Sequence, residues 1–435
     1  MDMRRLSEQL AFAKTIKQLR IEDGNAVRLA RVLVNETVRR KNFIDKFINN
    51  AITPASIDDF ILGVQAFLRL YVYQTRVAKK WSTPNVLEAR NIAHLVRSIL
   101  GWNTLREAEP YLGLLLTQEP DTVFSSTSDE ERVALRTFHP TWYVDYCFRL
   151  FGRTHALRIL EADIQQPPTY IRINTLKESP EKILNRLSEE GVEASKVEQS
   201  KFAYRVTSTR QPLTKTMSFQ EGLFYIQDKA SCFAAEATEP APDSTVLDVC
   251  AAPGAKTTYL AQLMQNRGHI YSIDYSTRRM NIWRKETARM GVEIAEPVLA
   301  DACSTLPINV KADVVALDPP CTSTGTFGRQ PSAKWRLTPL SIARMARIQW
   351  HMLDSVAELV KAGGTLVYST CSMAVEENEM VIERFLKWHL DFSLMEIVPR
   401  MGVPGLRGLS ECQRLFPHLH ECNGFFIAKM RRSTD

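Results

Sequence analysis

The sequence has no apolar run long enough to cross a bilayer, which argues against an integral membrane protein. A membrane-spanning helix needs about 18 or more consecutive apolar residues, and no segment of the 435 residues approaches that length. The first residues, MDMRRLSEQLAF, carry charges but have neither an apolar centre nor a cleavage signal. We therefore expect a cytoplasmic protein with no membrane partner.

Closely paired cysteines are also missing. None of the eight cysteines forms a C-x-x-C pair, which argues against a zinc site and leads us to expect no bound metal. Scattered thiols in a chain of this size are typical of a reduced cytosolic protein. The cysteines stand at positions 147, 232, 250, 303, 321, 371, 412 and 422.

Charge is only mildly biased. The chain holds 55 Lys and Arg against 49 Asp and Glu, a net charge of +6, which favours a polyanionic partner but also fits an ordinary soluble enzyme. Two basic runs, 39–41 and 76–80, lie in predicted helices. Such runs usually form a solvated face, and RNA contact is the alternative.

The pattern of apolar residues divides the chain into three predicted domains. Residues 1–150 show helical spacing throughout, with Ser56 as a candidate N-cap and a helix expected from Asn85. Residues 151–227 mix strand-like and helical segments and form a small α/β subdomain. Residues 228–435 alternate between strands and helices, which indicates a mostly parallel sheet covered on both faces.

Seven strands are expected in this last domain, and chemically informative residues follow several of them. The strands fall at 244–250, 269–274, 296–301, 312–318, 365–370, 392–397 and 424–430. In sheets of this kind, ligands bind at the carboxyl ends of the strands. The site is therefore expected at that edge.

The first three strand ends predict a nucleoside ligand. The turn CAAPGAK, 250–256, is built from small residues that let a ligand approach the backbone. Asp274 stands 26 residues after Asp248, a range at which an acid can hold ribose hydroxyls. Asp301 is placed to reach an adenine edge. Because G-x-G-x-x-G is absent, S-adenosylmethionine fits better than a dinucleotide, and a dehydrogenase is disfavoured; capping of helices or turns is the alternative role for each acid.

Two thiols follow the fourth and fifth strands. Cys321 stands in DPPCTSTG and Cys371 in STCSMAVEEN. A thiolate that adds to carbon 6 of cytosine or uracil makes carbon 5 nucleophilic enough to accept a methyl group. If the two strands are parallel neighbours, their ends lie about 5 Å apart. A small buried hydrophobe is the usual role of a free cysteine, and the residues alone do not rank the two thiols.

At these residues the chain resembles the Nop2/Sun (Fmu, RsmB-like) family of RNA 5-methylcytosine methyltransferases. The resemblance rests on LDVCAAPGAKTTYLAQ, IDYSTRRM, ADVVALDPPCTSTGTFGRQPSAKW and GGTLVYSTCSMAVEENE, and extends from about residue 138 to the end. It implies a Rossmann-like class I methyltransferase domain. The helical part resembles, in pattern only, the NusB-like RNA-binding domain of bacterial members.

The resemblance also implies roles for individual residues. Cys371 would attack carbon 6, Cys321 would assist release of the methylated RNA, and Asp318 would act at the base. S-adenosylmethionine would be bound by Cys250, Ala251, Ala252, Pro253, Gly254, Ala255, Lys256, Asp274, Arg279, Asp301 and Asp318. Ala255 departs from the glycine usual in the family, and its methyl group would crowd the cofactor if the position needs positive φ.

Three functions remain open. The first is transfer of a methyl group to carbon 5 of cytosine in ribosomal or transfer RNA, by a monomer. The second is the same chemistry on uracil, and the third is an RNA-binding protein with an inactive methyltransferase fold. We expect the two amino-terminal domains, including Arg172 and Lys177, to hold RNA.

Overall fold

The computed structural model describes residues 8–78, 86–125 and 127–434. Contacts divide the chain into two units, Met1–Gln165 with Phe327–Arg336, and Gln166–Thr326 with Leu337–Asp435. The helices of the first unit run to Ala162, beyond the boundary expected near residue 150. No described helix is both long and apolar enough to cross a membrane.

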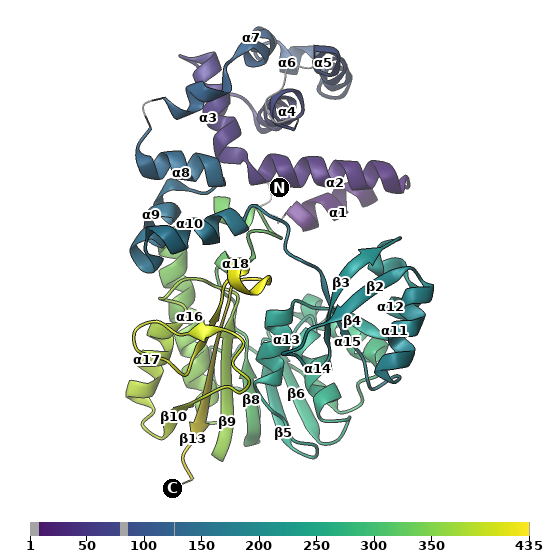
Figure 1. Ribbon diagram of the computed structural model, residues 1–435, viewed down its shortest axis with the longest axis vertical. Helices are drawn as coiled ribbons and strands as arrows, with labels where there is room; N and C mark the ends of the chain where they lie inside the picture. Colours follow the sequence, from purple (N-terminus) through teal and green to yellow (C-terminus); the bar gives the residue numbers. More distant parts are fainter. Residues whose placement is uncertain (1–7, 79–85, 126, 435) are drawn as a thin grey trace. The chain divides into compact units, whose positions relative to one another are not determined.

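The first unit is helical (Figure 1). Its apolar core centres on α3, which buries Phe43, Ile44, Phe47 and Ile48 at the helical spacing seen in the sequence. Ser56 does cap, with a full capping box, but it caps a short 3₁₀ turn rather than a long helix. The predicted start at Asn85 lies outside the described residues. The helices are α1 (Glu8–Leu19), α2 (Gly24–Arg39), α3 (Lys41–Ile52), α4 (Leu62–Val72), α5 (Val86–Leu100), α6 (Trp102–Leu105), α7 (Tyr111–Thr117), α8 (Asp129–Thr137), α9 (Thr141–Phe151) and α10 (Arg153–Ala162).

The first arginine of each basic run is buried rather than solvated. Arg39 is buried and donates to the carbonyl oxygens of Asp163 and Gly328. Arg76 is buried and donates to the carbonyl oxygens of Leu116 and Gln118. Both guanidinium groups therefore satisfy backbone carbonyls within the unit, and sequence could not distinguish this from RNA contact.

A ten-residue segment, Phe327–Arg336, completes the first unit although it lies far from the helices in sequence. Phe327 packs edge-on against Tyr143, with ring centroids 5.4 Å apart. Trp335 donates its indole N–H to the carbonyl oxygen of Val38 at 2.6 Å. Lys334, between them in sequence, is fully buried. Segment 327–336 is thus part of the helical core, although it follows the Cys321 loop in the chain.

The second unit begins with a small antiparallel sheet in the order β2-β3-β1-β4. Arg172 on β1 is fully buried and donates to the Ala255 carbonyl and the Thr258 hydroxyl. The expectation that Arg172 contacts RNA is therefore wrong in this conformation, whereas Lys177 is exposed. The elements are β1 (Tyr170–Ile173), α11 (Pro180–Glu189), β2 (Val192–Lys196), β3 (Ala203–Thr209), α12 (Met217–Gln220) and β4 (Phe224–Ile226).

The remaining strands form the large sheet, in the order β11-β12-β13-β9-β8-β5-β6-β7, with β10 on β13. The pairs from β7 to β9 are parallel, and those on the β13 side are antiparallel. The expected fold class is confirmed, but the described residues form nine strands rather than seven. The strands are β5 (Thr245–Val249), β6 (His269–Asp274), β7 (Ala295–Leu299), β8 (Ala312–Leu317), β9 (Val360–Thr370), β10 (Phe392–Met395), β11 (Val403–Pro404), β12 (Gln413–Leu415) and β13 (Phe425–Arg432).

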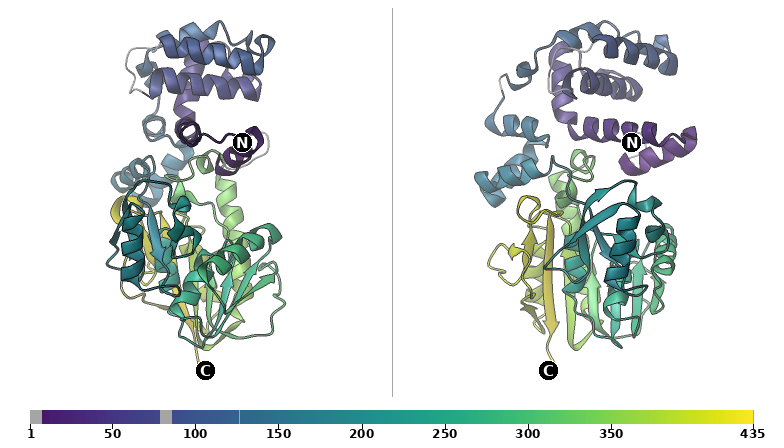
Figure 2. Two further views of the ribbon diagram at one scale, coloured as in Figure 1. Left: turned by 90° about the vertical axis from the view of Figure 1, so that its right-hand side faces the viewer. Right: turned by 45° about the vertical axis from the view of Figure 1, so that its right-hand side comes forward.

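Helices cover both faces of this sheet, as its continuous apolar strands require (Figures 1 and 2). Side chains alternate along each strand. On β8, Val315 and Leu317 pack with α16 and α17, whereas Val314 and Ala316 pack with α14. The helices are α13 (Lys229–Glu236), α14 (Ala255–Leu263), α15 (Thr277–Met290), α16 (Pro339–Ala357), α17 (Glu379–Trp388) and α18 (Pro417–His420).

Candidate active site

The two strand-end thiols are in contact. Strands β8 and β9 are parallel neighbours, with Leu317 paired to Tyr368, so the loops that follow them leave the same edge of the sheet. Cys321 Sγ lies 3.3 Å from Cys371 Sγ. The Gly325 N–H donates to the Cys371 carbonyl at 2.9 Å and joins the two loops.

The surroundings of the two thiols are not equivalent. A hydrogen bond from Cys321 lowers the pKa of Cys371, and Ser323 and Lys256 lower it further, against burial and Asp318. The same hydrogen bond between the two sulfur atoms, together with burial and the charges of Cys371, Glu377 and Asp318, raises the pKa of Cys321 well above its usual range. The pKa shifts therefore favour Cys371 as the thiol that ionises first, and Cys321 as the donor of a hydrogen bond to the resulting thiolate.

This asymmetry predicts a pH shift. In Cys321→Ala the thiolate of Cys371 loses its main donor, so its pKa should rise and the midpoint of its alkylation by iodoacetamide should move to higher pH. Between the two midpoints the unaltered protein should react faster. Peptide mass spectrometry resolves Cys371 from exposed Cys303, whose unchanged rate is the internal reference. A midpoint that stays or falls would contradict the assigned direction.

The turn after β5 brings the other predicted residues to the same edge of the sheet. Cys250 and Gly254 both have positive φ, 66° and 114°. The chain between them forms a tight turn beside Asp274. The Asp274 carboxylate is buried, accepts from the Ala252 N–H at 3.3 Å, and pairs with Arg279 at 3.3 Å. Asp274 and Arg279 thus support the turn itself.

The remaining predicted residues are placed as follows. Lys256 forms an ion pair with Asp318, so it neutralises the acid of the DPPC motif. Ala255 is the first residue of α14 and has no positive φ, so its methyl group causes no strain there. Asp301 is exposed and accepts from the Cys303 N–H at 2.9 Å, a local turn contact.

Asp248 is buried inside the sheet, where it accepts from the Thr257 hydroxyl at 2.5 Å. Burial raises the pKa of its carboxyl to about 6. Asp248 therefore stabilises the join between β5 and α14.

Known proteins are similar to this chain along almost its whole length. The model of the 16S rRNA methyltransferase RsmB/F family matches residues 235–431, and that of the RsmF/B-like ferredoxin-like domain matches residues 139–211. A Bacillus subtilis protein named probable ribosomal RNA small subunit methyltransferase B is 32% identical over 97% of this chain and 94% of its own length. The chain belongs to the RsmB/F methyltransferase family. It is therefore a methyltransferase.

Other members and solved structures extend the RsmB/F comparison. A tRNA (cytosine(72)-C(5))-methyltransferase of Pyrococcus horikoshii is 36% identical over 51% of this chain and 56% of its own. A crystal structure titled PH0851 covers 98% of this chain and 94% of its own, at 30% identity and a TM-score of 0.85. NSun6 from Pyrococcus horikoshii, solved with SFG, covers 68% of this chain and 99% of its own, at 26% identity and a TM-score of 0.64.

Two groups of the RsmB/F site escaped sequence reasoning. Ser323 touches the Cys371 thiol at 3.5 Å, and the buried carboxylate of Glu377 accepts from the backbone beside Cys321. Both lie within quoted motifs, DPPCTSTG and STCSMAVEEN. The available signal for Glu377 was an acid in an otherwise loop-forming stretch, six positions after a candidate nucleophile.

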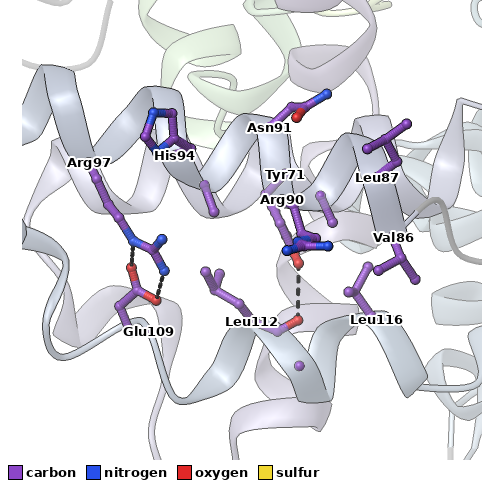
Figure 3. A pocket seen from close by; sticks show the side chains of 13 residues that line it. Tyr71, Val86, Leu87, Arg90, Asn91, His94, Arg97, Glu109, Leu112 and Leu116 are labelled. Atoms are coloured by element: carbon purple, nitrogen blue, oxygen red, sulfur yellow. Dashed lines mark hydrogen bonds and ion pairs between the residues drawn. The ribbon is translucent and has the colours of Figure 1, made fainter.

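The helical unit of this RsmB/F protein carries its own cavity, of about 610 Å³. Figure 3 shows Arg90, His94 and Arg97 of α5 along one side and Leu112 and Leu116 of α7 along the other. Arg97 is held by a bidentate pair with Glu109, at 2.6 Å for both bonds. Among the described residues, no group of three or more His, Cys, Asp or Glu side chains could hold a metal ion.

Proposed function

We propose that this protein methylates carbon 5 of cytosine in ribosomal or transfer RNA, with S-adenosylmethionine as methyl donor and a covalent thiol adduct at carbon 6. The observation that carries the proposal is the pair of contacting thiols, 3.3 Å apart, of which Cys371 has the lowered pKa. One thiol suffices for attack. A second thiol beside it supports a reaction that must also release its product.

The residues at the carboxyl edge of the sheet fit a nucleoside cofactor. Asp274 offers a buried carboxylate at the end of β6, where ribose hydroxyls are held in sheets of this kind. Ala251 and Ala252 keep the neighbouring turn small, and Asp301 on the next strand end is exposed. When bound, S-adenosylmethionine supplies an electrophilic methyl group.

The thiols supply the rest of the chemistry. The Cys371 thiolate would add to carbon 6 of the base, and the electron pair of the 5,6 double bond would move to carbon 5. Carbon 5 would then bond to the methyl carbon while the bond between that carbon and the sulfonium sulfur breaks. The proton on carbon 5 must leave, with Cys321 as its acceptor directly or through water. The electron pair of the broken bond between carbon 5 and hydrogen restores the 5,6 double bond and expels the Cys371 thiolate.

Asp318 is the group proposed to meet the base edge. Its carboxylate is paired with Lys256, and as an acceptor it can take a hydrogen bond from the exocyclic amine of cytosine. Lys256 also lowers the pKa of Cys371. One cation therefore serves both the thiolate and the acid.

Cytosine is favoured over uracil by the relatives. Those named by their target base, in Pyrococcus horikoshii and Schizosaccharomyces pombe, are cytosine-C5 enzymes. The test is to incubate the protein with S-adenosylmethionine and with RNA from a strain that lacks the gene for this protein, and then to sequence the RNA after bisulfite treatment. Newly protected cytosines are the expected result. Methyl incorporation without protected cytosine would point to uracil, and no incorporation into any RNA would reject the enzyme function.

We also propose that the helical unit and the small sheet hold the RNA while the large sheet carries the chemistry. The net charge of +6 supports this, because Lys and Arg neutralise RNA phosphates. Lys177 is exposed on the small sheet's side of the second unit, and Arg90 and His94 line the cavity of the helical unit. These residues replace Arg39, Arg76 and Arg172 as candidates for RNA contact.

The cofactor proposal predicts a binding defect. Loss of hydrogen bonds to a charged group costs about 1.5–3 kcal/mol, so Asp274→Ala should weaken S-adenosylmethionine binding roughly 10- to 150-fold by calorimetry. The matched control is Asp313→Ala, because Asp313 lies at the opposite edge of the sheet, where it accepts from the Thr245 N–H at 2.8 Å. A folded Asp274→Ala protein with unchanged affinity would reject the placement.

A further inference from the structure

Glu377 lies buried between the two thiol loops. It belongs to the segment that joins β9 to α17, and none of its surface is exposed. Its carboxylate accepts from the Thr322 N–H at 2.9 Å, the Ser372 hydroxyl at 2.6 Å and the Gln349 amide at 2.8 Å. The Thr322 hydroxyl donates to it as well.

Three of these four donors belong to the two loops that carry the thiols. Thr322 directly follows Cys321, and Ser372 directly follows Cys371. Gln349, on α16, also donates to the carbonyl of Pro320 at 3.0 Å, on the other side of Cys321. The carboxylate of Glu377 therefore ties both loops to each other and, through Gln349, to a helix.

The pattern of bonds requires a carboxylate. All four donors are neutral, and burial raises the pKa of Glu377, so the position is costly for a charged group. An ionised carboxylate has about four acceptor sites and no donor, whereas an amide has one acceptor oxygen and an NH₂ group. Glutamine could not accept from Thr322 N–H, Gln349 and both hydroxyls without setting donor against donor.

We infer that Glu377 is a positioning residue that holds the Cys321 and Cys371 loops together, so that Cys321 Sγ stays within hydrogen-bonding distance of Cys371 Sγ. Its importance for methylation rests on the proposed function. Its effect on the thiols does not, because alkylation of Cys371 can be measured without RNA or cofactor.

The charges around the thiols give the test its direction. Cys371 is influenced by Cys321, Lys256 and Asp318, whereas the charge of Glu377 acts on Cys321, whose pKa it raises. Loss of that charge alone would make Cys321 more acidic and leave Cys371 largely unaffected. Separation of the loops would instead raise the pKa of Cys371, because its donor withdraws.

The experiment compares Glu377→Gln with Glu236→Gln in the full chain. Glu236 is a matched control, since its buried carboxylate also accepts from neutral groups, Ser200 at 2.5 Å and the Lys201 N–H at 3.0 Å, outside the thiol loops. We expect only Glu377→Gln to shift the midpoint of Cys371 alkylation to higher pH. Methyl transfer should fall about 100-fold, as expected for a small misplacement of reacting groups, with unchanged cofactor affinity.

Each outcome decides the inference. An unchanged or lowered alkylation midpoint in Glu377→Gln, or an equal change in Glu236→Gln, would overturn it. If Glu377→Gln does not fold, Ser372→Ala takes its place, because it removes one of the four donors to Glu377. The midpoint of Cys371 alkylation should then be higher in Ser372→Ala than in the unaltered protein. If the unaltered protein fails to methylate cytosine, the proposed function fails, while the midpoint still tests the role of Glu377.

Discussion

Cys371→Ala should bind RNA and S-adenosylmethionine normally and yet lose methylation altogether. The reason is that carbon 5 of cytosine is a weak nucleophile until a thiolate adds to carbon 6, and Cys371 is the thiol whose pKa the site lowers. Removal of a catalytic nucleophile can cost on the order of 10⁶-fold in rate. We expect a loss of roughly 10⁴-fold or more in methyl incorporation, and no RNA–protein band on a denaturing gel.

The conservative variant and a buried thiol outside the two thiol loops serve as controls. Cys371→Ser keeps the size of the side chain but not its ionisation at neutral pH, so it should be nearly as inactive. Cys232→Ala removes a buried thiol on α13 and should methylate RNA as the unaltered protein does. Substantial methylation by Cys371→Ala would assign the attack to another residue.

Cys321→Ala should fail at the opposite end of the reaction, by remaining attached to its product. In the resting site the hydrogen bond with Cys371 raises the pKa of Cys321 and so favours its protonated form. Once Cys371 is bound to carbon 6 as a thioether, the negative charge of its thiolate is gone and Cys321 becomes free to ionise and accept the carbon 5 proton. Without Cys321 the adduct should form, receive one methyl group and persist.

A labelled RNA resolves the two variants on one denaturing gel. We expect a persistent shifted band for Cys321→Ala, about one methyl group per protein, and no multiple turnover. The control is Cys371→Ala/Cys321→Ala, in which the band should vanish. A band with Cys371→Ala and none with Cys321→Ala would reverse the roles, and the absence of a band in both would leave release to another group.

Sequence predicted the elements that long periodic runs specify and missed those that depend on tertiary contacts. Strands β5, β6, β8 and β9 are apolar because helices bury both of their faces, so they stand out from their surroundings. Strands β11 and β12, of two and three residues, are too short to show a period. Their pairing with β13 supplies what the local sequence does not.

The site follows the same division. Residues that end predicted strands or closely follow them, such as Asp274 and Cys321, could be placed at one edge because parallel strands share their direction. Whether an individual charged residue is buried or exposed could not be predicted. Arg172 and Glu377 look like ordinary polar residues in sequence, and only folding shows that the first is buried against α14 and the second between two loops.

The placement of segment 327–336 limits how this protein can be divided. The chain enters the helical unit a second time after Thr326 and leaves it again before Leu337, so a single cut near residue 165 does not separate the two units. A fragment that starts at 166 would carry Phe327 and Lys334 without the helices that bury them. Any shortened version made for crystallography or assay needs either the helices or a replacement for these ten residues, and they begin only six positions after Cys321.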